Sequence, residues 1–256
     1  MRSIATYLFL LIHLNVSTSV HSQDDEIGGI GIDITTTVLN RYVWRGYDLS
    51  HKDPALMTYL NYSPAALKGF TLSAGTIFGL KNAREQGDDQ SNIDEFDITA
   101  AYEIQVIPSK LLVTASVLYY KYTSHWTKLY YEDTKDIELN LMGVYSANKF
   151  FVPYLSYFRG IDDGIKGSYV ETGFSHEFVF SENLALTPKY YTGFSSQYEF
   201  RSNQKFTNMA AEFPLGYTKG PFYAEVSGIL IRPLASSLNG SKKIIFCSAL
   251  NASYTF

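Results

Sequence analysis

The sequence has one cysteine, Cys247, so no disulfide can form within the chain. Beyond its N-terminal segment it lacks any run of the roughly 20 apolar residues that a membrane-spanning helix needs. It also lacks a basic patch and a Gly-rich phosphate loop, and its 21 Lys and Arg stand against 25 Asp and Glu, for a net charge of −4. A nucleic-acid-binding protein would carry the opposite sign. These absences exclude a disulfide-stapled domain, a helical membrane protein and a nucleic-acid partner.

Patterns of catalytic or metal-binding residues are scarce as well. Only His51, His125 and His176 follow the first 22 residues. His125 lies near Glu132 and Asp133, but this spacing is not diagnostic of a metal site. We therefore expect no enzymatic activity, no metal and no cofactor.

The N-terminus has the features of an export signal. Met1-Arg2 is positively charged, a mostly apolar stretch runs from Ile4 to Val16, and the small residue Ser22 precedes Gln23. The apolar stretch is too short to span a bilayer, which favours a cleaved signal peptide over 1–22 rather than a membrane anchor. The remaining residues, 23–256, are enough for one large all-β domain.

Aromatic residues are abundant: 21 Tyr, 17 Phe and 2 Trp make up 16% of the chain. They are dispersed among polar residues, as in the aromatic belts of a transmembrane β-barrel. The C-terminal residues 250–256 alternate between an apolar and a polar face and end in Phe256. We expect them to form a lipid-facing closing strand with Tyr254 and Phe256 at a membrane interface. Such an ending is also what the barrel-assembly machinery of bacteria recognises, so this machinery is an expected partner together with the lipid bilayer.

Twelve strand-like segments follow one another along the chain. They cover 31–43, 54–63, 68–79, 93–105, 110–122, 135–146, 150–159, 167–180, 184–194, 205–217, 221–231 and 243–256. Short turns alternate with longer polar loops, which predicts a transmembrane antiparallel up-and-down β-barrel of about 12 strands with both termini on the periplasmic side. Pro153 and Pro214 interrupt two segments, so we expect a bulge or strand end there. Ten or fourteen strands remain alternatives.

Charged residues gather on one face of these segments. A charge against lipid costs about 2–4 kcal/mol for Lys or Arg at the midplane and somewhat less for Asp or Glu, so this face must point inward. The expected lumen residues are Arg41, Arg45, Glu95, Asp97, Glu138, Glu171, Lys189, Glu212 and Glu225, joined by Asp33, Glu103 and Asp136. If water fills the lumen, the excess of carboxylates favours cations. A packed lumen would need more partners for these carboxylates than the few basic residues provide.

The most distinctive internal motif is Asn40-Arg41-Tyr42-Val43-Trp44-Arg45-Gly46, followed by Asp53-Pro54-Ala55. It resembles the aromatic–Arg–Gly segment near the start of the TorF-type porins, Gram-negative outer-membrane proteins with a signal peptide and a barrel of similar size. The matching positions are Tyr42, Trp44, Arg45, Gly46, Pro54 and Ala55, whereas Asn40 departs from the Ser of that family. The resemblance implies a channel in the outer membrane and no particular chemistry.

The residues of this motif also predict local structure. We expect Tyr42 and Trp44 on the outward face at the outer end of the first strand, within the aromatic belt. Arg41 and Arg45 would share the inward face, four residues and about 13 Å apart. Gly46 would permit the turn into the loop. Two interpretations stay open: the arginines shape a constriction, or they pair with inward carboxylates and brace the barrel.

The loop at 123–134 carries His125, Trp126, Tyr130 and Tyr131, whose rings could bind a surface ligand or fold over the mouth of the barrel. Our main hypothesis is a bacterial outer-membrane porin that lets small polar solutes or cations diffuse through a narrow, carboxylate-rich lumen. The alternative is a closed structural barrel whose extracellular loops bind a surface ligand or partner.

Overall fold

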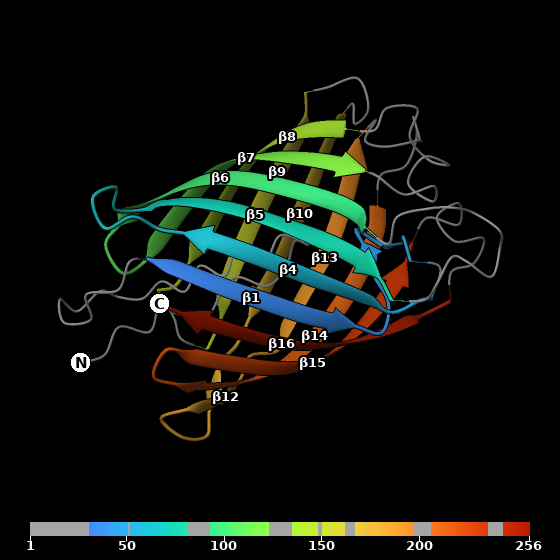
Figure 1. The fold of residues 1–256 in the computed structure, drawn as a ribbon. Helices are drawn as coiled ribbons and strands as arrows, with labels where there is room; N and C mark the ends of the chain where they lie inside the picture. The colour runs from blue at the N-terminus through green and yellow to red at the C-terminus, as the bar shows by residue number, and fades with distance from the viewer. Residues whose placement is uncertain are drawn as a thin grey trace.

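The computed structural model describes residues 31–50, 52–80, 93–122, 135–147, 150–161, 167–196, 206–234 and 243–256 (Figure 1). Its regular elements are all β-strands. In these ranges there is no helix long and apolar enough to cross a membrane. The expected signal peptide (1–22) and the aromatic loop 123–134, with His125, Trp126, Tyr130 and Tyr131, lie outside the described residues.

Twelve antiparallel strands form the barrel wall. They are β1 (Ile32–Leu39), β4 (Ala55–Tyr62), β5 (Phe70–Gly79), β6 (Ile93–Ile107), β7 (Leu111–Tyr122), β8 (Lys135–Tyr145), β9 (Val152–Gly160), β10 (Gly167–Ser175), β13 (Lys189–Ser196), β14 (Phe206–Lys219), β15 (Phe222–Pro233) and β16 (Ile245–Thr255). β1 pairs with β16, and β14 pairs with both β13 and β15, so the sheet closes. Since the fourteen-stranded sheet also contains β11 and β12, twelve strands remain for the wall, which confirms the predicted fold class.

The connections follow the predicted short–long rhythm. Short connections at 63–69, 108–110 and 220–221 lie at the end of the barrel that holds the C-terminus (Figure 1). The longer connection between β1 and β4, residues 40–54, lies at the opposite end. An up-and-down barrel with an even number of strands produces this arrangement.

Two predicted strands are interrupted. The segments 167–180 and 184–194 are split by a side hairpin of β11 (Phe178–Val179) and β12 (Leu184–Leu186), and the predicted turn at 181–183 is its tip. At Pro214, β14 changes its neighbour from β13, which pairs up to Glu212, to β12, which pairs from Leu215. The missing proline N–H therefore lies where β14 changes its neighbour. β14 itself continues through Pro214 to Lys219 and pairs with β15 without a register shift, so the strand end or bulge expected at Pro214 does not occur.

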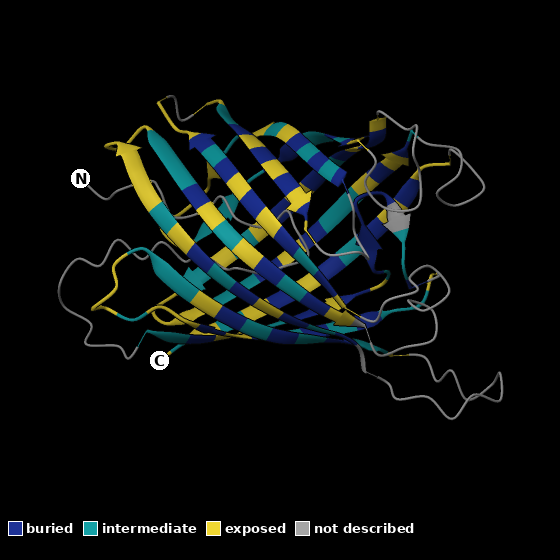
Figure 2. Ribbon diagram, turned by 90° about the horizontal axis from the view of Figure 1, so that it is seen from above, coloured by how far each residue is buried: buried dark blue, intermediate teal, exposed yellow. Residues whose placement is uncertain are grey.

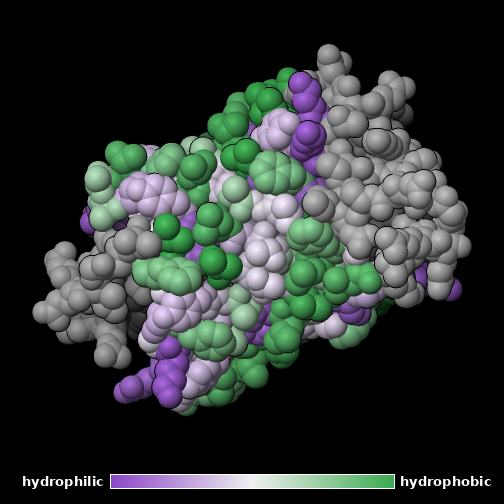
Figure 3. All heavy atoms as spheres, in the orientation of Figure 1, coloured by the Kyte–Doolittle hydropathy of each residue, from purple (hydrophilic) through white to green (hydrophobic). Residues whose placement is uncertain are grey.

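The inward and outward faces of the wall differ in burial and polarity, as the two-residue alternation predicts. Figure 2 shows buried and exposed residues alternating along the strands. Large apolar side chains cover the outward face, including Leu60, Ile98, Val117, Leu141, Leu155, Val226 and Leu250, and apolar groups gather over the wall in Figure 3. Tyr254 and Phe256 are 45% and 50% exposed, so both point outward. Their depth relative to a membrane stays a prediction.

Candidate channel site

The chain leaves the wall directly after β1 and turns into the barrel. Asn40 still bonds to the neighbouring strand β16: its N–H donates to Ser248 O (3.1 Å) and its Oδ1 accepts from Ser248 N (2.8 Å). Residues 40–53, which we call the inserted segment, then close on themselves. Leu49 N donates to Tyr42 O (2.9 Å), and Tyr42 N donates to Ser50 Oγ (2.9 Å). These bonds hold together a small hairpin of β2 (Val43–Trp44) and β3 (Tyr47–Asp48).

The tip of this hairpin is a tight turn of Arg45 and Gly46. Both residues have positive φ, 49° and 89°, as the two central residues of a type I′ turn must. Gly46 accepts this conformation freely, and a Cβ there would come within 3.0 Å of Asn208 Cβ on β14. Arg45 holds the left-handed conformation at a cost of about 1–3 kcal/mol. Its side-chain contacts must offset that cost.

Arg45 reaches the far side of the barrel. Its Nη1 and Nη2 donate to Glu138 Oε1 (3.0 Å) and Oε2 (3.2 Å) on β8. Starting from β1, the wall runs through β4, β5, β6, β7 and β8 to β9 in one direction, and through β16, β15, β14, β13 and β10 to β9 in the other. β9 is therefore opposite β1, and β8 is its neighbour. The inserted segment thus crosses the interior from wall to wall.

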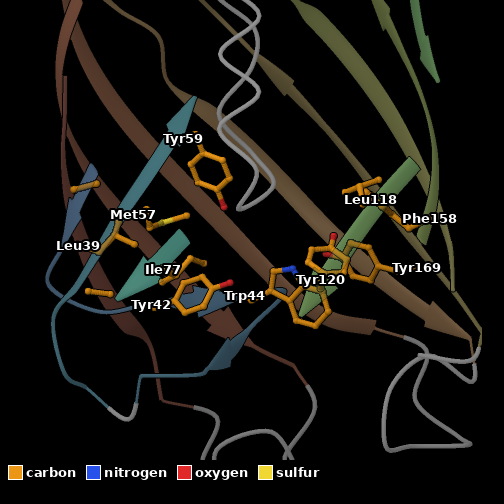
Figure 4. Packing of buried hydrophobic residues seen from close by; sticks show 12 residues of the cluster. Leu39, Tyr42, Trp44, Met57, Tyr59, Ile77, Leu118, Tyr120, Phe158 and Tyr169 are labelled. Atoms are coloured by element: carbon orange, nitrogen blue, oxygen red, sulfur yellow. The ribbon is translucent and has the colours of Figure 1, made fainter. Parts of the chain in front are cut away.

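Three aromatic faces surround the Arg45 guanidinium. Its Cζ lies 4.5 Å from the ring centroid of Trp44, 4.2 Å from Phe158 and 4.4 Å from Tyr169. Phe158 and Tyr169 come from β9 and β10, so the far wall supplies two of the rings (Figure 4). We call Glu138, Trp44, Phe158 and Tyr169 the guanidinium cage. A delocalised cation between ring faces and a bidentate carboxylate is a strongly held group.

Tyr42 and Trp44 do not lie where the sequence predicted. Each is only 4% exposed, inside the barrel. Tyr42 Oη donates to Glu95 Oε2 on β6 (3.0 Å), and Trp44 packs edge-on against Tyr120 with ring centroids 6.5 Å apart. The prediction extended strand alternation beyond Asn40, where the chain has already left the ladder. The outward aromatic-belt assignment of these two rings is therefore wrong.

The two arginines are also separated from each other by the turn. Arg41 lies at the base of the inserted segment, with Nε 3.5 Å from Asp48 Oδ2 and a side chain that is 21% exposed. Arg45 lies at the tip, with a side chain that is 4% exposed. The predicted common strand face for Arg41 and Arg45 is wrong, because neither belongs to β1. Both make ion pairs, and only Arg45 reaches an expected lumen carboxylate.

Most of the remaining expected lumen residues lie inside, whereas Glu103 is only half-buried. Glu95, Asp97, Glu138, Glu171, Lys189, Glu212 and Glu225 are all at most 5% exposed. Lys189 stands directly opposite Glu212 on the neighbouring strand. These side chains are therefore buried inside the barrel, and their assignment as lumen-lining residues of a channel stays a prediction.

Tyrosine hydroxyls are the partners that sequence reasoning missed. They donate to most of the inward carboxylates: Tyr42 to Glu95, Tyr59 to Asp97, Tyr120 to Glu138, Tyr154 and Tyr169 to Glu171, and Tyr223 to Glu225. Each bond supplies a donor to a carboxylate without adding a positive charge. The sequence signal for these partners is the two-residue alternation, which already turns Tyr59 and Tyr120 toward the same inward face as the carboxylates. The interior is consequently hydrogen-bonded and still acidic.

Tyr59 also needs a glycine beneath it. Its ring crosses the neighbouring strand over Gly75 to reach Asp97 on β6, and a Cβ at Gly75 would overlap the ring. A close approach of this kind leaves no room for any larger residue. Within the described ranges no group of three or more His, Cys, Asp or Glu side chains is arranged to hold a metal ion.

No protein-family model and no curated protein sequence matches the chain. Its fold is similar to solved barrels. A KdgM porin matches with a TM-score of 0.57 at 10% identity, covering 88% of this chain and 99% of that one. The COG4313 outer-membrane channel from Pseudomonas putida F1 matches with a TM-score of 0.51 at 12% identity, covering 93% and 100%. The translocator domain of autotransporter NalP from Neisseria meningitidis matches with a TM-score of 0.54 at 11% identity, covering 91% and 90%. At these identities the likeness shows the fold, and membership of the TorF-type family stays a prediction.

Proposed function

We propose that the chain is a channel of the bacterial outer membrane through which small polar solutes or cations diffuse passively. In this proposal the signal peptide 1–22 directs export, and the barrel-assembly machinery inserts the domain through its C-terminal strand. The observation that carries the proposal is the inserted segment, which crosses the lumen and docks Arg45 on Glu138. A segment folded into a twelve-stranded barrel narrows the path without filling the interior as a packed core would.

The charge of the interior supports a preference for cations. Eight inward carboxylates on the wall strands are at most 7% exposed: Asp33, Glu95, Asp97, Asp136, Glu138, Glu171, Glu212 and Glu225. In the described ranges only Arg45 and Lys189 oppose them as buried cations. Rings of carboxylates favour cations and repel anions. A KdgM porin was solved with oligogalacturonate, but this acidic interior does not suit a polyanion, so we do not carry that cargo over.

A second candidate is a closed barrel that serves as a binding scaffold. The bidentate Arg45–Glu138 pair favours it, because an arginine–carboxylate bridge across the lumen could act as a plug rather than a constriction. In that case function would reside in the extracellular loops, with His125, Trp126, Tyr130 and Tyr131 as the binding candidates. Neither candidate assigns catalysis to the chain.

Single-channel recording of the refolded, signal-free protein under a salt gradient tests both candidates. Discrete steps with a cation-selective reversal potential support the channel. In Glu138→Gln the positive Arg45 loses its counter-charge, so the reversal potential should move toward anion selectivity. Arg41→Ala removes a positive charge outside the cage, so it should not move the reversal potential toward anion selectivity. If protein shown to be folded gives no steps, the scaffold replaces the channel.

A further inference from the structure

The groups around Arg45 enclose its planar cation between a carboxylate and aromatic ring faces. Both oxygens of Glu138 accept hydrogen bonds, at 3.0 and 3.2 Å, and Tyr120 Oη donates to Oε2 of the same carboxylate (2.9 Å). Phe158 and Tyr169 present ring faces 4.2 and 4.4 Å from the guanidinium carbon. These four residues belong to the wall strands β7, β8, β9 and β10. The site therefore consists mainly of wall residues, and the inserted segment contributes Trp44 and Arg45 itself.

We propose that this wall site binds small organic cations with a guanidinium head, and that Arg45 occupies it as an intramolecular ligand. The proposal rests on the proposed function only in that such cations would arrive through the lumen. A guanidinium matches the site because its planar fork donates two parallel hydrogen bonds to one carboxylate while its faces stack on rings. An alkylammonium makes the ring contacts without the fork, and a hydrated inorganic cation makes neither well.

Backbone geometry at the tip makes Arg45 a replaceable occupant. Arg45 holds a φ of 49°, which a non-glycine residue adopts only when its surroundings impose it. The contacts of the side chain in the cage are what offset the cost of this conformation. An incoming guanidinium would restore the contacts to Glu138, Phe158 and Tyr169, so exchange leaves no buried carboxylate without a cation. Passage of such a solute would then be coupled to movement of the tip.

Emptying the cage tests the proposal without any need for conduction. The chain has 2 Trp, Trp44 and Trp126, so in a Trp126→Phe background Trp44 alone reports on the cage. The refolded protein in detergent micelles is titrated with methylguanidinium chloride, against potassium chloride of equal ionic strength. In Arg45→Ala we expect a saturable fluorescence change. With Arg45 present, the same concentrations should give little response, since the site is already filled.

Two variants define the site. Adding Glu138→Gln to Arg45→Ala should weaken methylguanidinium binding by about tenfold or more, because charge-assisted bonds to the carboxylate are lost. Arg41→Ala removes the same charge outside the cage and should respond as the protein with Arg45 does. Methylammonium should bind Arg45→Ala more weakly than methylguanidinium.

Several outcomes overturn the proposal. They are the absence of a saturable response in folded Arg45→Ala, an equal response to potassium chloride, and binding that Glu138→Gln leaves unchanged. Arg45→Gly suits the positive φ better and repeats the test if Arg45→Ala does not fold. If neither variant folds, Arg45 is a structural brace and the proposal fails. A channel that conducts but shows no binding would contradict this inference alone and leave the proposed function standing.

Discussion

The barrel wall and the inserted segment keep their positions by different means. Wall strands pair with neighbours through long ladders, such as β14 and β15 from Asn208–Pro233 to Lys219–Phe222. The inserted segment has only its own two-residue strands, and it is held by side chains such as Arg45, whose partner Glu138 is 93 residues away. A wall strand is held by many equivalent backbone hydrogen bonds, whereas the position of the inserted segment depends on a few side-chain contacts. We therefore expect a charge on the outward surface to destabilise the wall most. Loss of a single side-chain contact should be enough to displace the inserted segment.

The largest expected effect comes from a charge on the outward face of the wall. Val226 is 54% exposed and lies between Leu215 and Leu250 of the neighbouring strands. Val226→Arg should lower the free energy of unfolding by about 2–4 kcal/mol if this position lies near the bilayer midplane. Urea unfolding in lipid vesicles measures the loss.

The matched control for that variant is Phe222→Arg, on the same face at the first residue of β15. Near a membrane interface the same charge should cost only about 0–1 kcal/mol. An equal loss at both positions would contradict the assignment of this face to lipid.

A smaller loss should follow from Gly75→Ala inside the wall. The new Cβ would displace the Tyr59 ring and break its bond to Asp97, which should cost about 1–3 kcal/mol. Gly143→Ala is the control, because a Cβ there meets nothing within 4 Å. Urea unfolding of both variants compares them. The account of Tyr59 is wrong if Gly75→Ala is no less stable than Gly143→Ala.

Tyr120→Phe tests the contact between the wall and the inserted segment. It keeps the ring beside Trp44 but removes the hydroxyl that donates to Glu138. We expect a loss of about 1–2 kcal/mol, since a hydrogen bond to a charged group is lost from the interior. Tyr119→Phe, one residue earlier on the opposite face of β7, should change stability less. Equal losses of stability in urea unfolding of the two variants would contradict a stabilising hydrogen bond between Tyr120 and Glu138.

The smallest expected effect is a gain. Ser109, between β6 and β7, has a φ of 57°. Ser109→Gly should relieve this backbone and stabilise the barrel by about 0.5–1 kcal/mol after allowing for the greater entropy of the unfolded chain. Thermal or urea midpoints measure the gain, with Lys110→Gly as a control that should not stabilise. A loss of stability in Ser109→Gly would contradict the interpretation that the backbone at Ser109 is strained.

The wall could be predicted from the sequence, because lipid on one side and polar side chains on the other impose a two-residue period along each strand. That period turns Glu95, Glu138 and Glu225 inward and Leu250 outward, and the structure buries the three glutamates and exposes Leu250. It says nothing about a segment outside the ladder, so Tyr42 and Trp44 were assigned to the wrong environment. The partners of Arg45 lie on β8, β9 and β10, and no local pattern encodes contacts over that distance. The side hairpin of β11 and β12 was missed for a related reason, since each of its strands is only two or three residues long.

Removing the inserted segment would test most directly whether it narrows the channel. Leu39 and Ala55 stand directly opposite each other on β1 and β4, so residues 40–54 can be replaced by an Asn-Gly turn without breaking the ladder. The account predicts that the shortened protein folds and shows larger single-channel conductance steps than the full domain under the same salt. Steps of unchanged size from folded, shortened protein would contradict the assignment of residues 40–53 as the constriction.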